Sequence, residues 1–299
     1  MENIVGHEKI IESLKNIVKS GKISNAYLFC GMDGIGKFLI SKEFAKSILC
    51  LNSIDGKYCD NCDSCKTVNS SSDLTILESE EGVIKVDRVR LLCKEIMLKP
   101  TISNRRVFII NDADLMNDSA QNALLKSLEE PPKYATIILV ATNKSKLKKT
   151  ILSRCVTIDF HELSKDELIS ISKQNDIEIN DTLLNYSGGS FGKLLSLINC
   201  DYLNLIDDFK NSIDSGSILE MNKALSGIKK IKTLKEDIND IINMLVKMLS
   251  HTLTEDCKNR VKQISIIEEA RNNINRNANL EDSLDYMAVR LWEESKRRN

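Results

Sequence analysis

The feature that most restricts how this chain can fold is a glycine-rich segment, Cys30-Gly31-Met32-Asp33-Gly34-Ile35-Gly36-Lys37-Phe38, which follows the apolar run at 26–29. Its glycines and Lys37 match the first seven positions of the phosphate-binding loop G-x-x-x-x-G-K-[ST], in which backbone amides and a helix N-terminus surround phosphate oxygens. Apolar residues then recur at helical spacing from 37 to 49. A strand, this loop and a helix predict an α/β domain with a parallel sheet. The candidate nucleotide-binding residues of the loop are Gly31, Gly34, Gly36 and Lys37.

Two positions that normally hold magnesium lack a suitable ligand. The eighth loop position, where a hydroxyl usually coordinates the ion, is Phe38. A second apolar run at 107–110 is followed by Asn111, where an aspartate usually binds magnesium, and by Asp112, which is shorter than the glutamate often found there. We therefore expect hydrolysis to be lost at this site, with nucleotide binding left open.

Cysteine spacing indicates a metal site. Four of the nine cysteines form the pattern C-x8-C-x2-C-x2-C, and they are Cys50, Cys59, Cys62 and Cys65. Zinc favours four thiolates in a closed tetrahedron, and such a site is structural because no position stays open for water. Unrelated reduced thiols are the alternative. The other five are expected to be small core residues, and they are Cys30, Cys93, Cys155, Cys200 and Cys257.

The remaining sheet pattern continues to residue 158. Strands are expected at 74–77, as a buried strand, and at 107–110, 136–141 and 155–158, with helices between them. Thr142 and Asn143 follow a strand and are placed to sense a phosphate. The segment 144–154 carries five basic residues and no acid, which predicts a solvated face or a surface for DNA or for a partner's anion. His7, near the start of the first helix, is expected at the surface or as a cap.

After Phe160 the pattern becomes helical. Ser164 and Glu167 form a capping box, and a glycine-rich segment at 188–193 opens another helix. The predicted fold class is α/β followed by all-α. The domains are 1–160, with the cysteine module at about 50–65, then a small helical unit at 161–200 and a longer helical bundle at 201–299.

Charge and hydropathy exclude some functions. The formal net charge is −1, so no global excess of basic residues indicates nucleic acid or membrane partners. No apolar run approaches the roughly 20 residues of a membrane span, and the start has no signal-peptide pattern. We expect a cytoplasmic protein without membrane contact.

Several strings together resemble the clamp-loader branch of the AAA+ ATPases, most closely the delta-prime subunits of bacterial DNA polymerase III. They are Val5-Gly6-His7, the loop 31–37, the cysteine insertion, Gln121-Asn122-Ala123-Leu124-Leu125-Lys126-Ser127-Leu128-Glu129-Glu130-Pro131-Pro132, and Ser153-Arg154-Cys155. The asparagine-to-proline string and Ser-Arg-Cys on one chain are specific. Ser-Arg-Cys alone is weak.

The resemblance implies a five-membered ring, with gamma/tau and delta subunits, that loads a sliding clamp on primer-template DNA. Residues 161–200 would be a lid and 201–299 a collar. Arg154 would act as an arginine finger on ATP bound by the adjacent subunit. Lys193 stands where the family usually has a sensor arginine. ATP or ADP would be held without hydrolysis, beside a structural zinc ion. The alternative is an active gamma/tau-like ATPase.

Overall fold

The computed structural model describes residues 4–68, 70–80, 82–179, 181–198, 202–230, 241–246, 249–250, 257–276 and 278–296. Its internal contacts divide the chain into two compact units, Met1–Lys193 and Leu194–Asn299. The boundaries expected at 160 and 200 stay predictions, and residues 199–201 lie outside the described part of the chain.

The first unit is built on a five-stranded parallel sheet with the strand order β2-β3-β4-β1-β5. The strands are β1 Ala26–Cys30, β2 Leu74–Leu77, β3 Arg106–Ile110, β4 Ala135–Ala141 and β5 Val156–Asp159. The three central strands are buried along their whole length, as their apolar runs predict. The strand predicted at 74–77 is present with those bounds, but its predicted burial is wrong, because β2 is an edge strand and Ile76 is 37% exposed.

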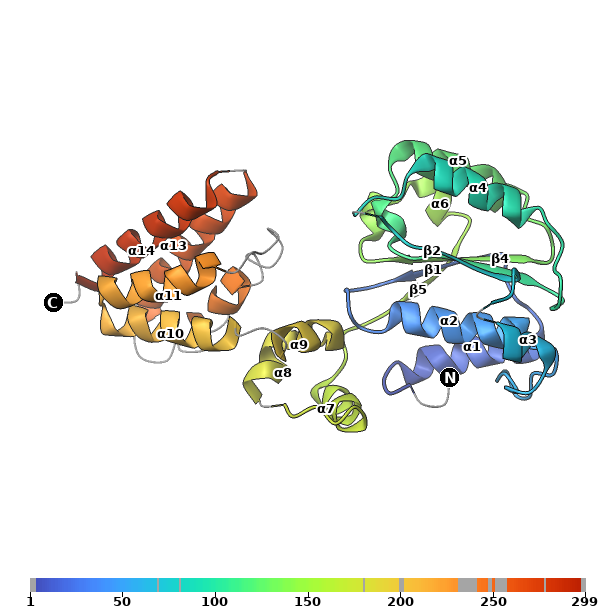
Figure 1. Cartoon of the computed structure of the whole chain (residues 1–299), viewed down its shortest axis with the longest axis horizontal. Helices are drawn as coiled ribbons and strands as arrows, with labels where there is room; N and C mark the ends of the chain where they lie inside the picture. The colour runs from blue at the N-terminus through green and yellow to red at the C-terminus, as the bar shows by residue number, and fades with distance from the viewer. Residues whose placement is uncertain are drawn as a thin grey trace. The chain divides into compact units, whose positions relative to one another are not determined.

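Helices cover both faces of this sheet (Figure 1). One face carries α1 Glu8–Ser20, α2 Lys37–Leu49 and α3 Asp63–Thr67, and the other carries α4 Val86–Ile96, α5 Asp118–Glu129 and α6 Lys149–Leu152. Short 3-10 turns, η1 Ala113–Leu115 and η2 Lys144–Lys146, follow β3 and β4. The two helix layers and the sheet enclose two apolar cores, one on each side. The arrangement confirms the predicted parallel α/β domain.

The helix ends follow local chemistry. Gly21 adopts a left-handed conformation that closes α1. At the start of α7 Lys165–Gln174, Ser164 and Glu167 form the predicted capping box. α4 begins at Val86, with Asp87 in its first turn, where a carboxylate interacts favourably with the helix dipole.

The rest of the described chain is helical, as expected. After α7 come α8 Asp181–Ser187, α9 Phe191–Ile198, α10 Tyr202–Ser215, α11 Ile218–Lys230, α13 Cys257–Asn275 and α14 Leu280–Lys296. In the second unit, buried side chains such as Phe209, Leu225 and Leu291 form a core between packed helices. Among the described residues, no helix combines the length and apolar character that crossing a bilayer requires.

Candidate functional site

The glycine-rich loop joins β1 to α2 at the carboxyl edge of the sheet, where parallel α/β proteins place their ligands. Gly36 is the N-cap of α2 and has φ 95°, a conformation that favours glycine. Lys37 is only 5% exposed, and its Nζ donates a 2.6 Å hydrogen bond to the carbonyl of Met32 within the loop. Burial lowers the pKa of Lys37, while the nearby carboxylate of Asp33 opposes that shift. The loop therefore encloses the side chain of Lys37.

The two weakened metal positions have other contacts. The ring of Phe38 packs against the apolar core and lies under the ammonium of Lys42, 5.0 Å from the ring centre. Asn111 donates from its amide to Asp112 Oδ2 at 3.2 Å. Burial, together with the charges of Asp33 and Asp114, raises the pKa of Asp112. Neither Phe38 nor Asn111 offers an anionic oxygen to a divalent cation.

Asp114 is a buried acid of this edge that sequence reasoning missed. Its carboxylate accepts hydrogen bonds from the backbone N–H and the hydroxyl of Thr142, at 3.1 and 2.7 Å. Asn143, expected to sense a phosphate, accepts from the N–H and hydroxyl of Ser145 and so caps η2. The carboxyl ends of β3 and β4 are thus linked through side chains. The position of Asp114, three residues after Asn111, is the signal that could have indicated it.

A cavity of about 600 Å³ adjoins the loop. Its walls come from the N-terminal segment, the loop and α2, and from α7 and the start of α9; they include Val5, Ile35, Leu163, Gln174 and Phe191. The space is mostly apolar, with amide groups near the end of α7. A largely apolar pocket beside a phosphate-type loop is suited to a flat ring system.

The glycine-rich turn before α9 touches the loop directly. Gly192 donates its N–H to the carbonyl of Gly34 at 2.9 Å. A Cβ atom at Gly192 would lie 2.8 Å from Gly34 Cα, so only glycine allows this approach without a shift. Lys193, the candidate sensor, is the next residue, and its backbone N–H bonds Ser190 Oγ at 3.0 Å. The structure therefore places Lys193 in the segment that lies against the loop.

His7 differs from the expectation of a surface or capping role. It is the N-cap residue of α1, but its side chain makes no capping hydrogen bond. Its Nε2 lies 2.9 Å from the carbonyl of Ile35, and its ring meets Phe160 edge-on at 5.0 Å between centres. The half-buried imidazole thus supports the loop from the side, because the fold brings the chain start against it.

Arg154 lies outside this pocket, in the turn between α6 and β5. Its guanidinium forms an ion pair with Glu129 at the end of α5, Nη2 to Oε1, at 2.8 Å. It also donates to the carbonyl of Thr150 at 2.8 Å. The side chain of Cys155 packs against the apolar core between the sheet and α4–α6, and burial raises the pKa of its thiol to about 12. The turn therefore anchors its cysteine and leaves its arginine at the surface.

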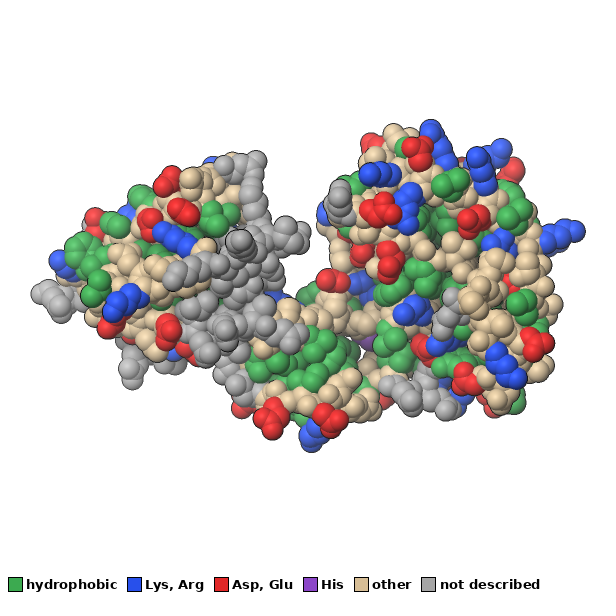
Figure 2. Space-filling view, in the orientation of Figure 1, with side chains coloured by type: hydrophobic (Ala, Val, Ile, Leu, Met, Phe, Trp, Pro, Cys, Tyr) green, Lys and Arg blue, Asp and Glu red, His purple; other side chains and the backbone are tan. Residues whose placement is uncertain are grey.

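Acids from other parts of the chain lie next to the basic segment 144–154. Lys144 pairs with Asp159, and Lys148 lies 3.9 Å from Asp118. On the face drawn in Figure 2, acidic and basic side chains are interspersed over the sheet domain. The fold supplies these acids from elements distant in the chain, which the local sequence did not reveal.

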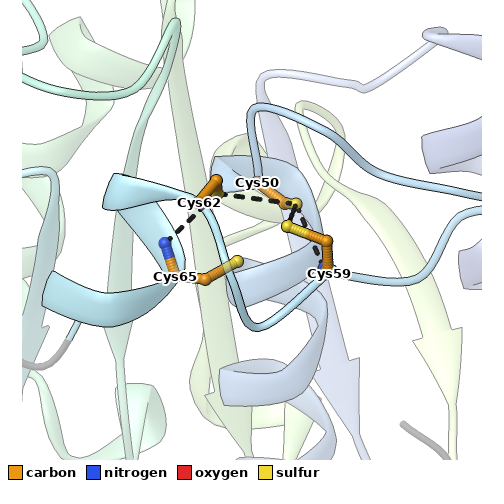
Figure 3. Close-up of side chains that lie close together, drawn as sticks. All are labelled: Cys50, Cys59, Cys62 and Cys65. Atoms are coloured by element: carbon orange, nitrogen blue, oxygen red, sulfur yellow. Dashed lines mark hydrogen bonds between the residues drawn. The ribbon is translucent and has the colours of Figure 1, made fainter.

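The four predicted zinc ligands converge at the end of α2 (Figure 3). Cys50 follows α2, Cys59 lies in the following loop, and Cys62 and Cys65 belong to the N-terminal end of α3. Their sulfur atoms all lie within 4.8 Å of one another, with Cys50 to Cys59 at 3.6 Å and Cys50 to Cys62 at 4.0 Å. Zn–S bonds of about 2.3 Å in a tetrahedron require S–S edges of about 3.8 Å. The geometry therefore fits zinc.

The electrostatics of the cluster also fit a cation. Burial opposes ionisation of Cys62, but hydrogen bonds from backbone N–H groups, including that of Cys65, lower its pKa to about 6. Burial and the neighbouring thiols raise the pKa of Cys65 to about 12. The four sulfurs therefore do not all ionise together unless a cation compensates their charge. The module also packs on α2, where the Tyr58 hydroxyl donates to Glu43 at 2.7 Å.

The other predicted core cysteines have mixed outcomes. Cys30 is buried, whereas Cys93 is half-buried and its thiol lies 3.5 Å from the carbonyl of Ala123. Cys200 and the side chain of Cys257 lie outside the described residues.

Comparison with known proteins finds a matching family and relatives among the subunits of DNA polymerase III. A family model described as DNA polymerase III, delta subunit, matches residues 6–164. The DNA polymerase III subunit tau/gamma of Haemophilus influenzae is 34% identical over 189 residues, which are 61% of this chain and 27% of that protein. The subunit gamma/tau of Mycoplasma genitalium is 31% identical over 261 residues, 81% of this chain and 42% of that protein. The chain thus spans less than half of either relative.

A solved structure shares the fold. The crystal structure of a DNA polymerase III gamma subunit-related protein from Thermotoga maritima has a TM-score of 0.55 and 18% sequence identity. The match covers 95% of this chain and 99% of that one.

Proposed function

The chain belongs to the DNA polymerase III delta-subunit family, and we propose that within it the chain is a delta-prime-type stator of the clamp loader. Its sheet domain resembles that of AAA+ proteins. The observation that carries the proposal is the combination of an intact loop, Gly31 to Lys37, with two metal positions occupied by Phe38 and Asn111. A pocket of this kind holds a nucleotide, ATP or ADP, without the cation that hydrolysis requires. Gly31, Gly34, Gly36 and Lys37 would surround the phosphates, with Asp112, Asn143 and Lys193 nearby.

The proposed contribution of the chain is made in trans. Arg154 projects from a surface turn, and its planar, always charged guanidinium suits the charge that develops on a transferred phosphoryl group. In a ring with gamma/tau and delta subunits, this arginine would reach ATP bound by the adjacent subunit. The assembly would load a sliding clamp on primer-template DNA. Residues 161–200 would serve as the lid and 201–299 as the collar of that ring.

The cysteine cluster is proposed to hold structural zinc through Cys50, Cys59, Cys62 and Cys65. Four thiolate ligands complete a tetrahedron, so the ion supplies folding energy rather than catalysis. A role in reading DNA is less consistent with its mixed charges, since Asp55 pairs with Lys19 of α1.

A second candidate, an active gamma/tau-like ATPase, is favoured by the 31–34% identity to relatives of that name. Steady-state ATP hydrolysis by the isolated chain separates the two. If the chain is a stator, any ATP hydrolysis measured for the isolated chain should be unaffected by Lys37→Ala. Turnover abolished by Lys37→Ala and retained by Lys42→Ala, the same change five residues further along α2, would favour the ATPase.

The assembled loader tests Arg154. An arginine finger is worth about 10³ to 10⁵ in rate, so Arg154→Ala should remove nearly all turnover at the neighbouring site while assembly and folding persist. Arg90→Ala, which removes an exposed arginine paired with Asp87, serves as the control. Full ATPase activity of an assembled Arg154→Ala loader would contradict the proposal.

A further inference from the structure

The side chain of Arg154 is held by a small set of contacts rather than left loose. Its guanidinium donates to Glu129 Oε1 at 2.8 Å, to the carbonyl of Thr150 at 2.8 Å and to Ser153 Oγ at 3.3 Å. The Thr150 carbonyl is part of α6, and Glu129 is the last residue of α5. A side chain at the end of α5 and a backbone carbonyl of α6 therefore hold the arginine together.

Among these contacts, only the one with Glu129 holds the Nη2 nitrogen of Arg154. The contacts to Thr150 and Ser153 both involve Nη1, whereas Glu129 bonds Nη2. An arginine side chain has several rotatable bonds, and the entropy of fixing them is large. Without Glu129, only one end of the planar guanidinium would be fixed.

The same geometry leaves the arginine able to bind a further acceptor. A guanidinium has five N–H groups, and the hydrogen bonds among the described residues use three of them. Nε–H and the second Nη2–H therefore stay available to a phosphoryl oxygen. Glu129 can thus keep its bond while the arginine contacts an anion.

We propose that Glu129 is a positioning residue, which orients the Arg154 guanidinium for the nucleotide of the adjacent subunit. This inference rests on the proposed trans role of Arg154. Glu129 itself does not touch the nucleotide. The side chains of Arg154 and Glu129 are 33% and 48% exposed, so the ion pair between them is partly screened by water and its effect is modest. Loss of the Glu129 carboxylate should therefore lower the rate of ATP turnover at the neighbouring site about two- to fivefold.

The test measures ATP turnover by the assembled loader containing Glu129→Gln, which keeps size and polarity but removes the charge. The expected result is a two- to fivefold lower kcat with KM for ATP unchanged, because the arginine acts in the transition state. Glu130→Gln alters the adjacent exposed glutamate and should leave kcat unchanged. An unchanged or increased kcat with Glu129→Gln would overturn the inference, an increase meaning that Glu129 withholds the arginine.

A double-mutant cycle separates positioning from a structural effect. In an Arg154→Ala background, Glu129→Gln should have no additional effect on kcat, whereas loss through poorer folding or assembly would persist there. If Arg154→Ala itself leaves turnover intact, the proposed function fails. If Arg154→Ala abolishes turnover but Glu129→Gln changes nothing, only the positioning role of Glu129 fails.

Discussion

At the scale of single residues, the loop after β1 keeps the backbone of a phosphate-binding loop, but one of its side chains can no longer bind magnesium. Lys37 is buried and bonded to Met32, so the loop keeps its shape through its own lysine. Phe38 packs against the apolar core and offers no hydroxyl. The backbone of a phosphate cradle thus persists while the chemistry for magnesium is missing.

A buried carboxylate far from this loop carries a clear stability prediction. Asp73 is 1% exposed and accepts hydrogen bonds from the backbone N–H groups of Thr101, Ile102 and Ser103, each at 2.8 Å. Burial alone would raise the pKa of Asp73, but these hydrogen bonds outweigh it and lower the pKa. The ionised form is therefore the one that the fold stabilises.

Asp73→Asn should reduce the free energy of unfolding by about 2 kcal/mol at neutral pH. The asparagine NH₂ group is a donor and cannot accept hydrogen bonds from the backbone N–H groups, and the negative charge that strengthened those bonds is lost. Since the folded pKa lies below the unfolded value of about 3.9, the difference from wild type is fully present above that pH and shrinks as pH falls through the folded pKa. Urea unfolding between pH 3 and 7 measures it. Asp87→Asn, at an 82% exposed side chain, should change little. A difference that grows in acid would contradict this account.

At the scale of elements, the contact between the loop and the start of α9 depends on two glycines. Gly34 and Gly192 meet at backbone distance because neither has a side chain. Further along, Leu163 donates to the carbonyl of Gly189 at 2.9 Å, so the chain before α7 lies against the same turn. Backbone contacts at glycines therefore hold this turn and the segment before α7 close to the loop.

Gly192→Ala has two opposing effects on stability, one on the helix and one on the contact with Gly34. Alanine favours a helix over glycine by about 1 kcal/mol. A Cβ atom 2.8 Å from Gly34 Cα forces the backbones apart, and such overpacking costs about 1–3 kcal/mol. We expect the steric cost to exceed the helix gain, so the free energy of unfolding should fall. A thermal or urea transition shifted to higher stability would show that the contact yields easily.

At the scale of the whole molecule, the two compact units have separate apolar cores. The cysteine cluster belongs to the first unit, at the end of α2. A bound zinc ion would therefore stabilise that unit alone, because a ligand raises the stability only of the part that must fold to bind it.

Calorimetry with and without a chelator checks this. We expect one zinc ion per chain by metal analysis and two unfolding transitions, of which only the one assigned to residues 1–193 moves to lower temperature when zinc is removed. Cys65→Ser should lose the ion and reproduce the shift, whereas Cys93→Ser, outside the cluster, should retain it. Equal shifts of both transitions, or zinc retained by Cys65→Ser, would contradict the prediction.

The sequence by itself determined the elements and the local motifs. The helix predicted from 37 to 49 has the observed bounds, and apolar runs marked the buried strands, since both depend on neighbours along the chain. The cysteine spacing likewise identified the cluster that the fold brings together.

Only the tertiary structure decided which distant groups meet. The pair of Arg154 with Glu129, 25 positions apart, and the contact of Gly34 with Gly192 have no periodic signal in the sequence. The edge position of β2 and the acids facing the basic segment were likewise missed. Strand order and helix packing set these contacts, and local spacing carries no information about either.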